Sequence, residues 1–368
     1  MDERALTERL IGYETSSSEG IKLCSGFIKG WLDARDIDVR QFTSRGLPVL
    51  WAEVGPEDPA ATVIFHGHVD VVPGRAEQFA PRVEGDRLIG RGAYDMKGGL
   101  ACLLLALADL RDQDRIRVRM AIVPDEESEE GEGQRGGDCL LANGFGGDFA
   151  VTGEPTDLQV GVAAKGVLAM RLLVEGRAAH GATPWLGENA ILRAIDTYRR
   201  IQALPFASRS SRLFERPSIN LGRILGGDAL NKVPDICAID VDVRYLPGQD
   251  PEEILAEVAE LPDSRVVSTF QREPADVDPS SPFVETLCAA AAANTDGHSM
   301  PVGRDGASDA VSFLRAGIPA VEFGPTGGGH HGPDEWVSVT SLGEYRRALG
   351  DFVRRLPERL ETAPAVGA

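Results

Sequence analysis

The sequence predicts an α/β protein with a mostly parallel central sheet, into which a smaller α+β domain is inserted. Short apolar segments typical of buried strands alternate with helical stretches in the first half of the chain and again near its end. This alternation is typical of parallel sheets. Between residues 165 and 272, strands of alternating polarity and further helices indicate a separate domain.

Four of the expected strands run directly into loops that carry His, Asp or Glu. They are "ATVIF" at 61–65, "IRVRMAIV" at 116–123, "DFAV" at 148–151 and "IPAVEF" at 318–323. The segment "GGLACLLLALADLRD" at 98–112 is apolar on almost every side, which predicts a buried helix. Because ligands of such folds bind beyond the carboxyl ends of the parallel strands, we expect a site where these four loops meet.

The inserted domain is expected to span residues 165–277, between a first part of the main domain at 1–164 and a second part at 278–368. Its last helix begins at "DPEEILAEV", where Asp250 is the capping residue and Pro251 occupies the first turn. The Pro- and Ser-rich stretch "REPADVDPSSP" follows this domain and is typical of a connector.

The composition excludes several classes of protein. The chain has 368 residues, which suffices for two domains, and its formal net charge of −19 argues against nucleic-acid binding. No apolar run approaches the roughly 18 residues that a membrane span needs, and the charged N-terminus does not resemble a signal peptide. Five scattered cysteines without a CxxC pair indicate reduced thiols. We therefore expect a cytoplasmic protein that binds neither nucleic acid nor membrane.

His68 and Asp70 follow the first of these strands. Two residues apart on an extended segment, they share a face, with Cα atoms about 6.6 Å apart. This spacing suits a pair in which His68 binds a metal and Asp70 accepts a hydrogen bond from its other ring nitrogen. A buried histidine beside a solvated aspartate explains the same pair equally well.

The next two loops add carboxylates. In "GRGAYDMKGG", Asp95 precedes the buried helix, where it is either a ligand or a helix cap. "PDEESEEGEG" contains Glu126 and Glu127, whose side chains point opposite ways in an extended chain. One of them is then suited to bind a metal and the other to face a substrate, although acidic runs of this kind are more often solvated loops.

The last two loops complete the set. Glu154 in "TGEPT" is either a ligand or an ordinary turn residue, and "GPTGGGHHGPDEW" carries His330 and His331 among glycines that are also suited to bind an anion. Together the loops supply the residues of a dinuclear metal site with a bridging carboxylate and a free general base. Three ligating carboxylates in one cleft would repel one another strongly unless cations with a total charge of about +4 lay between them.

Five motifs resemble a known family in their order along the chain: "HGHVDVVP", "GRGAYDMKGG", "DEE", "GEP" and "HGPDE". The family is that of acetylornithine deacetylase, succinyl-diaminopimelate desuccinylase and carboxypeptidase G, which are dinuclear zinc hydrolases. The resemblance covers essentially the whole chain. It implies a dizinc-exopeptidase-like catalytic domain, with residues 165–277 as a lid that also forms a homodimer.

The resemblance also implies the cofactor and its ligands. Two divalent ions are expected, Zn²⁺ first, with Co²⁺ or Mn²⁺ as alternatives. His68 and Glu154 would bind one metal, Glu127 and His331 would bind the other, and Asp95 would bridge them.

Further roles follow for residues near these ligands. Glu126 would be the general base, and Asp70 would orient the imidazole of the first ligand histidine. His331 matches the family's ligand better than His330, because it lies three residues before the Asp-Glu pair. His66 matches no ligand position, so that a structural role is expected for it.

Residues of the inserted domain and of a later segment match positions on the substrate side. His180 would reach across the dimer to the scissile carbonyl group, and Asn231 in "NKVP" and Arg244 in "DVRYLPG" would contact the substrate. Ser308 and Asp309 in "DGASDA" match a substrate-side segment. Without the resemblance, His180 would be assigned a structural role and Arg244 a salt bridge on a strand.

The implied reaction removes the acyl group from an N-acyl amino acid by means of metal-activated water, as in acetylornithine deacetylase or succinyl-diaminopimelate desuccinylase. A di- or tripeptidase or a carboxypeptidase of the same fold is the nearest alternative. A dinuclear phosphoesterase would need more basic residues near the metals, and a non-catalytic homologue would lack the base or a ligand. The sequence does not predict which acyl group or which amine is bound.

Overall fold

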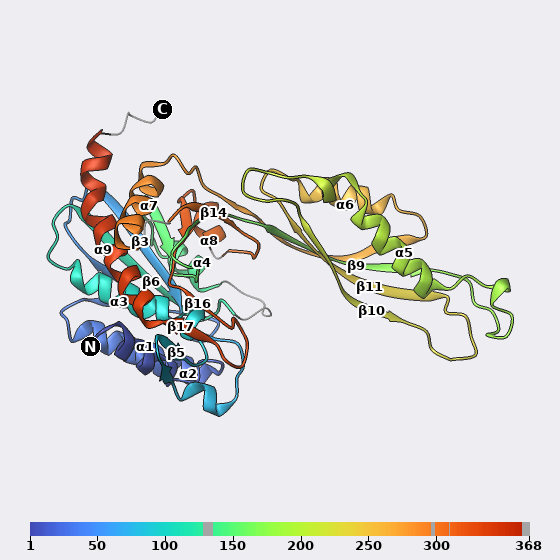
Figure 1. Cartoon of the computed structure of the whole chain (residues 1–368), viewed down its shortest axis with the longest axis horizontal. Coiled ribbons are helices and arrows are strands. Elements are labelled where there is room, and N and C mark those ends of the chain that lie inside the picture. Colours follow the sequence, from blue (N-terminus) through green and yellow to red (C-terminus); the bar gives the residue numbers. More distant parts are fainter. Residues whose placement is uncertain (128–134, 296–298, 309, 363–368) are drawn as a thin grey trace. The chain divides into compact units, whose positions relative to one another are not determined.

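The computed structural model describes residues 1–127, 135–295, 299–308 and 310–362, and these form two compact units (Figure 1). The first unit comprises Met1–Val162, Val277–Val302 and Asp309–Ala368, and the second comprises Ala163–Asp276 and Gly303–Ser308. The second unit thus starts at 163 rather than the expected 165 and ends at 276 rather than 277.

The observed and expected divisions differ more at the short segment Gly303–Ser308. This segment belongs to the second unit, whereas the sequence placed it in the main domain. Its position in the second unit has a local cause. The buried Lys165 forms an ion pair of 2.8 Å with Asp305, and Gly303 lies directly against the ring of Phe214. Such long-range contacts leave no signal in the local sequence.

The predicted mostly parallel sheet is confirmed in the first unit. Its strands follow the order β1-β2-β6-β3-β7-β15-β8, in which β3 is parallel to β6 and β7, and β15 is parallel to β7. The antiparallel strands β1 and β2 form one edge, and β8 pairs further with β13 and β14. The bounds are β1 Val39–Ser44, β2 Leu47–Val54, β3 Ala61–His68, β6 Ile116–Val123, β7 Phe149–Thr152, β8 Val160–Ala164, β13 Ala275–Asp276, β14 Pro301–Arg304 and β15 Ala320–Glu322.

Helices cover both faces of this sheet. On one face, α4 and α8 pack on Ile64, Ala121 and Ala150 through Leu140 and Phe313. On the other, α3 packs on β3 and is itself covered by α9 (Figure 1), which explains why α3 is apolar nearly all round. The bounds are α1 Glu3–Ile11, α2 Ser18–Asp33, α3 Gly98–Asp109, α4 Gly136–Ala142, α7 Pro282–Asn294, α8 Ala310–Arg315 and α9 Val339–Thr362.

The carboxyl ends of the parallel strands lie level with one another. His68 at the end of β3 is the register partner of Val123 at the end of β6. Thr152 at the end of β7 pairs with His66 of β3 and with Glu322 of β15. The loops that follow these strands therefore begin at the same edge of the sheet.

A small antiparallel sheet, which the sequence analysis did not predict, lies within the first unit. Its order is β16-β17-β5-β4, with bounds β4 Arg82–Glu84, β5 Arg87–Ile89, β16 Gly327–Gly328 and β17 Trp336–Ser338. The loop between β16 and β17 carries the paired histidines, and the loop after β5 carries Asp95. Pairing of β17 with β5 brings these two loops together.

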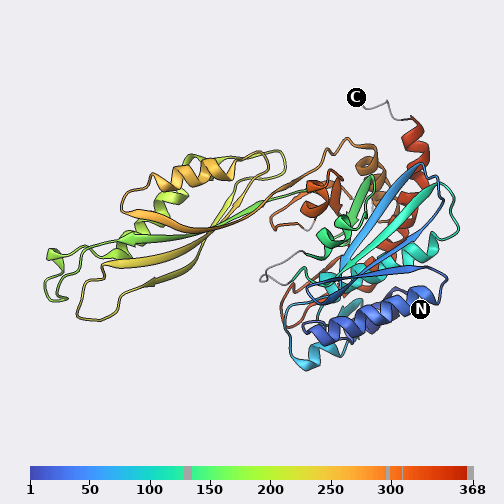
Figure 2. The ribbon, with the colours of Figure 1, turned by 180° about the vertical axis from the view of Figure 1, so that it is seen from behind.

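The second unit is a four-stranded antiparallel sheet in the order β10-β11-β9-β12. Helices α5 and α6 pack on one face, as Figure 2 shows from behind, and bury alternate residues of β9 and β11 such as Leu172 and Val241. The bounds are β9 Gly166–Glu175, α5 Ala190–Gln202, β10 Ser218–Gly226, β11 Ile236–Tyr245, α6 Pro251–Ala259 and β12 Ser264–Arg272. As expected, Asp250 caps α6 by accepting a hydrogen bond from the Glu252 amide.

Within the described part of the chain, no helix is both long enough and apolar enough to cross a membrane.

Candidate metal and catalytic site

His68 lies at the end of β3 and is completely buried. Its Nε2 atom is 3.1 Å from Asp95 Oδ1 and 3.5 Å from Glu154 Oε1. On the other side of the ring, Nδ1 is 2.9 Å from the main-chain oxygen of Asp70 and 3.5 Å from its carboxylate. Although burial opposes protonation, the hydrogen bonds to Asp70 and Asp95 raise the pKa of His68 well above its usual value.

Asp70 therefore contacts the imidazole most closely through its main chain, rather than through the carboxylate as the sequence suggested. The Asp70 carboxylate instead accepts hydrogen bonds from the main-chain amides of Glu126 at 3.2 Å and Glu127 at 2.8 Å. In this way Asp70 links the loop after β3 to the loop after β6. The sequence analysis missed this contact, because nothing in a single sequence pairs a side chain with distant amides.

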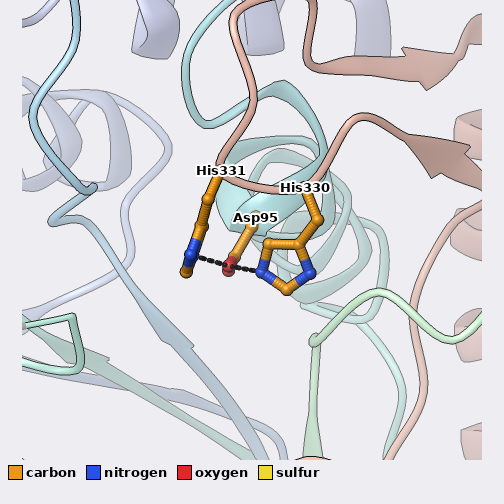
Figure 3. Close-up of side chains that lie close together, drawn as sticks. All are labelled: Asp95, His330 and His331. Carbon is orange, nitrogen blue, oxygen red and sulfur yellow. Dashed lines mark hydrogen bonds and ion pairs between the residues drawn. The ribbon is translucent and has the colours of Figure 1, made fainter. Parts of the chain in front are cut away.

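Asp95 is 95% buried and lies between the two groups of candidate ligands. Its Oδ1 atom faces His68, whereas its Oδ2 atom is 2.5 Å from His330 Nε2 and 3.2 Å from His331 Nε2 (Figure 3). His331 Nε2 is also 3.1 Å from Glu127 Oε1. The two oxygens of one carboxylate thus face two different sets of residues.

His330 and His331 both contact Asp95, and each side chain is about half exposed. The ring of His330 lies edge-on to Tyr94, with ring centroids 6.1 Å apart. His331 adopts a left-handed backbone conformation with φ of 58° and connects Asp95 to Glu127. The family resemblance assigned the ligand role to His331 and not to His330. In the structure, however, His330 approaches Asp95 more closely than His331 does.

Glu154 lies in the loop after β7. Its side-chain oxygen Oε1 is buried and has no hydrogen-bond partner among the described residues. Its main chain is held by a close approach to Gly324. A Cβ atom on Gly324 would lie 2.2 Å from the Glu154 carbonyl oxygen, so that only glycine fits there. The Gly324 amide donates a hydrogen bond to Thr156 Oγ1, which keeps the two loops together.

The pKa values of the site residues are shifted because several carboxylates and imidazoles lie close together in a buried region. Burial and the nearby Asp95 raise the pKa of Glu154 well above its usual range, and Glu126 adds to the shift. Burial alone would raise the pKa of Asp95, but hydrogen bonds from His330, His331 and His68 hold it well below its usual range. Hydrogen bonds to Asp95 and Glu127 raise the pKa of His331 to about 10. The imidazoles of His68, His330 and His331 thus surround carboxylates whose charge a bound cation would also balance.

These residues fit a metal ion. For bonds of about 2.0–2.1 Å, two ligands of a tetrahedral zinc ion lie about 3.3 Å apart. The separations of His68 Nε2 from Asp95 and Glu154 are 3.1 and 3.5 Å, and those of His331 Nε2 from Asp95 and Glu127 are 3.2 and 3.1 Å. The Glu154 oxygen, which accepts no hydrogen bond from the described residues, and the imidazole and carboxylate groups match the ligand preference of such ions.

Two more buried residues, Arg91 and Glu335, support the loops of the site. Their side chains form an ion pair of 2.7 Å and are 4% and 1% exposed. Glu335 ends the motif "HGPDE", and the sequence predicted no role for it. Its position just after a glycine-rich loop was the local signal.

Comparisons with known proteins place this site in a family. Residues 64–355 match the model of peptidase family M20/M25/M40. The chain belongs to this family. A succinyl-diaminopimelate desuccinylase from Erythrobacter litoralis is 29% identical over 307 residues, which cover 80% of each chain. The match includes all four loops at the carboxyl ends of the parallel strands.

Solved structures show the same fold. A tripeptidase from Staphylococcus aureus superposes with a TM-score of 0.79 at 19% identity, over 97% of this chain and 99% of that chain. A dinuclear metal-binding peptidase of the M20 family from Bacillus subtilis has a TM-score of 0.64 at 16% identity, over 98% and 99% of the two chains. As an M20 protein the chain is a hydrolase of amide bonds, and the family is metal-dependent.

The remaining predicted residues of this M20 protein lie in its second unit. His180 forms a β-bridge with Lys232, and the adjacent Gly181 amide donates a hydrogen bond of 2.7 Å to the Asn231 carbonyl, so that His180 and Asn231 are neighbours. Arg244, on β11, pairs with Asp242 at 3.0 Å.

Ser308 and His66 are both buried. Ser308 belongs to the second unit, and its predicted neighbour Asp309 lies outside the described residues. The ring of His66 lies edge-on to Phe313, and burial, with a contribution from His68, lowers the pKa of His66 to about 3. The packing of the His66 ring against Phe313 of α8 supports the structural role expected for His66.

Proposed function

We propose that this M20 protein is a metal-dependent amidohydrolase that removes the acyl group from an N-acyl amino acid, of the desuccinylase or deacetylase type. One observation carries the proposal: one oxygen of Asp95 contacts His68, which pairs with Glu154, and the other contacts His330 and His331, of which His331 also contacts Glu127. The curated relatives support the acyl substrate, since the desuccinylases cover 80% or more of the chain at 28–30% identity.

The five residues of this arrangement are the proposed ligands of two divalent ions, with Zn²⁺ preferred over Co²⁺ and Mn²⁺ for imidazole and carboxylate donors. Bound there, the ions would lower the pKa of a water molecule and polarise the acyl carbonyl group. Asp70 holds the ring of His68 and the main chain of Glu126 and Glu127 in place. His331 is chosen over His330 because it contacts Glu127 as well as Asp95.

Glu126 is the proposed general base. Its main chain is fixed next to Glu127, and its charge lies close enough to Glu154 to raise the pKa of that residue. Glu126 would take a proton from the attacking water and deliver it to the leaving amine. His180 would stabilise the oxyanion that develops on the acyl carbonyl group, and Asn231, Arg244 and Ser308 would contact the substrate.

We also propose that the second unit forms a homodimer. Strand β10 lies at the edge of its sheet and exposes Ile224 and Leu225, which are 39% and 55% exposed. Leu192 of the adjacent helix α5 is 62% exposed. A free strand edge beside exposed apolar residues is suited to pair with the same surface of a second copy.

A peptidase is the competing candidate, and one observation favours it. A probable carboxypeptidase from Aspergillus terreus is 34% identical over 203 residues, which cover 52% of this chain and 47% of that protein. A free peptide and an N-acyl amino acid present the same amide bond and the same carboxylate. The two classes differ in whether the substrate carries a free α-amino group or an acyl group.

The deciding experiment measures amine release from N-succinyl-diaminopimelate, N-acetylornithine, other N-acyl amino acids and free dipeptides. Each assay is run with added Zn²⁺ or Co²⁺ and repeated with a chelator. Release from an acyl amino acid that the chelator abolishes supports the proposal. Cleavage of peptides alone would replace it with the peptidase, and activity that is insensitive to the chelator would contradict the metal mechanism.

A further inference from the structure

The buried carboxylate of Glu335 is fully used by hydrogen bonds to the loop that carries Asp95. Its Oε1 atom accepts from the main-chain amides of Tyr94 and Asp95, both at 3.0 Å. Its Oε2 atom accepts from the Gly92 amide at 3.0 Å and from Arg91 Nη1 at 2.7 Å. Each oxygen therefore has two donors, which only an ionised carboxylate can satisfy.

Arg91 extends the same network to the histidine loop. While its Nη1 atom binds Glu335, its Nη2 atom donates a hydrogen bond of 3.0 Å to the main-chain oxygen of His331. The planar guanidinium group holds both partners in one fixed geometry. His331 has a left-handed backbone, so that an external contact is needed to stabilise its conformation.

We propose that Glu335, acting with Arg91, is a positioning residue that sets the distance between Asp95 and His331 and thereby the geometry of the metal site. The inference rests on the proposed function, because it assumes that Asp95 and His331 are ligands. Glu335 is not one of the five proposed ligands. It acts through the main chain of the two loops that carry these ligands, and Asp95 and His331 are 236 residues apart in sequence.

The test compares three purified full-length variants with the wild-type protein. Glu335→Gln removes one acceptor oxygen and places an amide N–H₂ group against two donors. Arg91→Lys keeps the positive charge but loses the fork that reaches His331. Asp334→Asn is the matched control, because the Asp334 side chain is 80% exposed and its pair with Arg82 lies at the surface.

Two quantities are measured on protein that circular dichroism shows to be folded: the dissociation constant for Zn²⁺, and the visible absorption spectrum after loading with Co²⁺. We expect Glu335→Gln to weaken metal binding by about 10- to 100-fold, as for other outer partners of metal ligands, and to change the cobalt spectrum. Arg91→Lys should act in the same direction, and Asp334→Asn should match the wild type.

Unchanged affinity and an unchanged cobalt spectrum in folded Glu335→Gln would overturn the inference. If that variant does not fold, the same two measurements on Arg91→Lys decide the question. Failure of the proposed function is distinct, because it would appear in the wild-type protein, which would then either bind no metal or release no amine from acyl amino acids. A general loss of stability would lower the unfolding temperature but would leave the spectrum of the folded, cobalt-loaded protein unaltered.

Discussion

Asp95 shows how burial and partners together determine what a carboxylate does. Taken out of water, its charge is costly unless it is balanced, and here three histidine rings lie within 3.2 Å of its two oxygens. The neighbouring Glu154 lies 3.5 Å from His68, and one of its buried oxygens lacks a hydrogen-bond partner within the described part of the chain. A divalent cation between the two residues would resolve this asymmetry.

The first prediction at the residue scale separates the proposed base from the ligands. Glu126→Gln should lower kcat by at least about 10²- to 10⁴-fold, because an amide cannot accept the proton of the attacking water. The metal content should stay unchanged. Steady-state kinetics with metal analysis of the same sample would check both. Loss of metal in this variant would show that Glu126 is a ligand instead.

A second prediction separates the two adjacent histidines. His331→Ala should lose about one of the two metals, because it removes a donor next to both Asp95 and Glu127. His330→Ala is the matched comparison and should keep both. Metal analysis after dialysis against metal-free buffer gives the answer. The reverse pattern would mean that the closer contact of His330 with Asp95 identifies the true ligand.

At the scale of elements, the start of α9 depends on a residue far away in sequence. Asp86 precedes β5 and accepts hydrogen bonds from Thr340 N at 2.9 Å, from Thr340 Oγ1 at 2.7 Å and from Ser338 Oγ at 2.5 Å. Ser338 in turn accepts from the Ser341 amide. The first amides of the helix are thus capped by two side chains, which fixes α9 to the small sheet that carries the histidine loop.

The corresponding prediction concerns stability and its pH dependence. Asp86→Ala should lower the free energy of unfolding by about 1 kcal/mol at neutral pH, because it removes a capping acceptor. Glu84→Ala, on the exposed side of the same hairpin, is the control and should have little effect. Denaturant unfolding of both variants at several pH values provides the measurement.

The sign of the pH effect follows from the pKa of Asp86. Its slight burial favours the neutral form, but the hydrogen bonds from Ser338 and Thr340 outweigh this and lower the pKa below its ordinary value. A lowered pKa contributes stability above the unfolded-state value of about 3.9, and this contribution is lost as the pH falls through the folded-state pKa. The difference between Asp86→Ala and the wild type should therefore shrink in acid. A difference that grows in acid would contradict the assignment.

At the scale of the whole molecule, the proposed site residues are divided between two units. The candidate ligands lie in the first unit, whereas His180, Asn231 and Arg244 lie in the second. If His180 acts across the proposed dimer, a chain that lacks Glu126 and a chain that lacks His180 can complete each other. A protein in which every chain carries the same substitution does not distinguish this arrangement from one in which His180 acts within its own chain.

The prediction is complementation between inactive variants. Glu126→Gln and His180→Ala should each be inactive alone, but after mixed refolding they should recover about a quarter of the wild-type activity, because half of the random dimers are hybrids with one complete site. Leu225→Glu, at the exposed edge of β10, should prevent both dimer formation and recovery. Light scattering and activity assays measure the two effects. No recovery among confirmed hybrid dimers would place His180 in the site of its own chain.

The sequence by itself determined the elements that local chemistry controls. Hydrophobic runs gave β3, β6, β7 and β15 as buried parallel strands, because apolar β-branched residues between polar loops favour that state. The order of strands and helices then implied that the loops with His68, Glu126, Glu154 and His331 share one edge of a sheet. The motifs in these loops led to the family that the comparisons confirmed.

Only the tertiary structure decided which atoms meet. Asp70 holds two distant amides, Glu335 and Arg91 join two loops, and both His330 and His331 contact one oxygen of Asp95. The small sheet that joins these loops has strands of two or three residues, too short to leave a periodic signal. A sequence encodes which residues are polar, but contacts between segments hundreds of residues apart depend on the packing of the whole chain, and only that packing fixes their geometry.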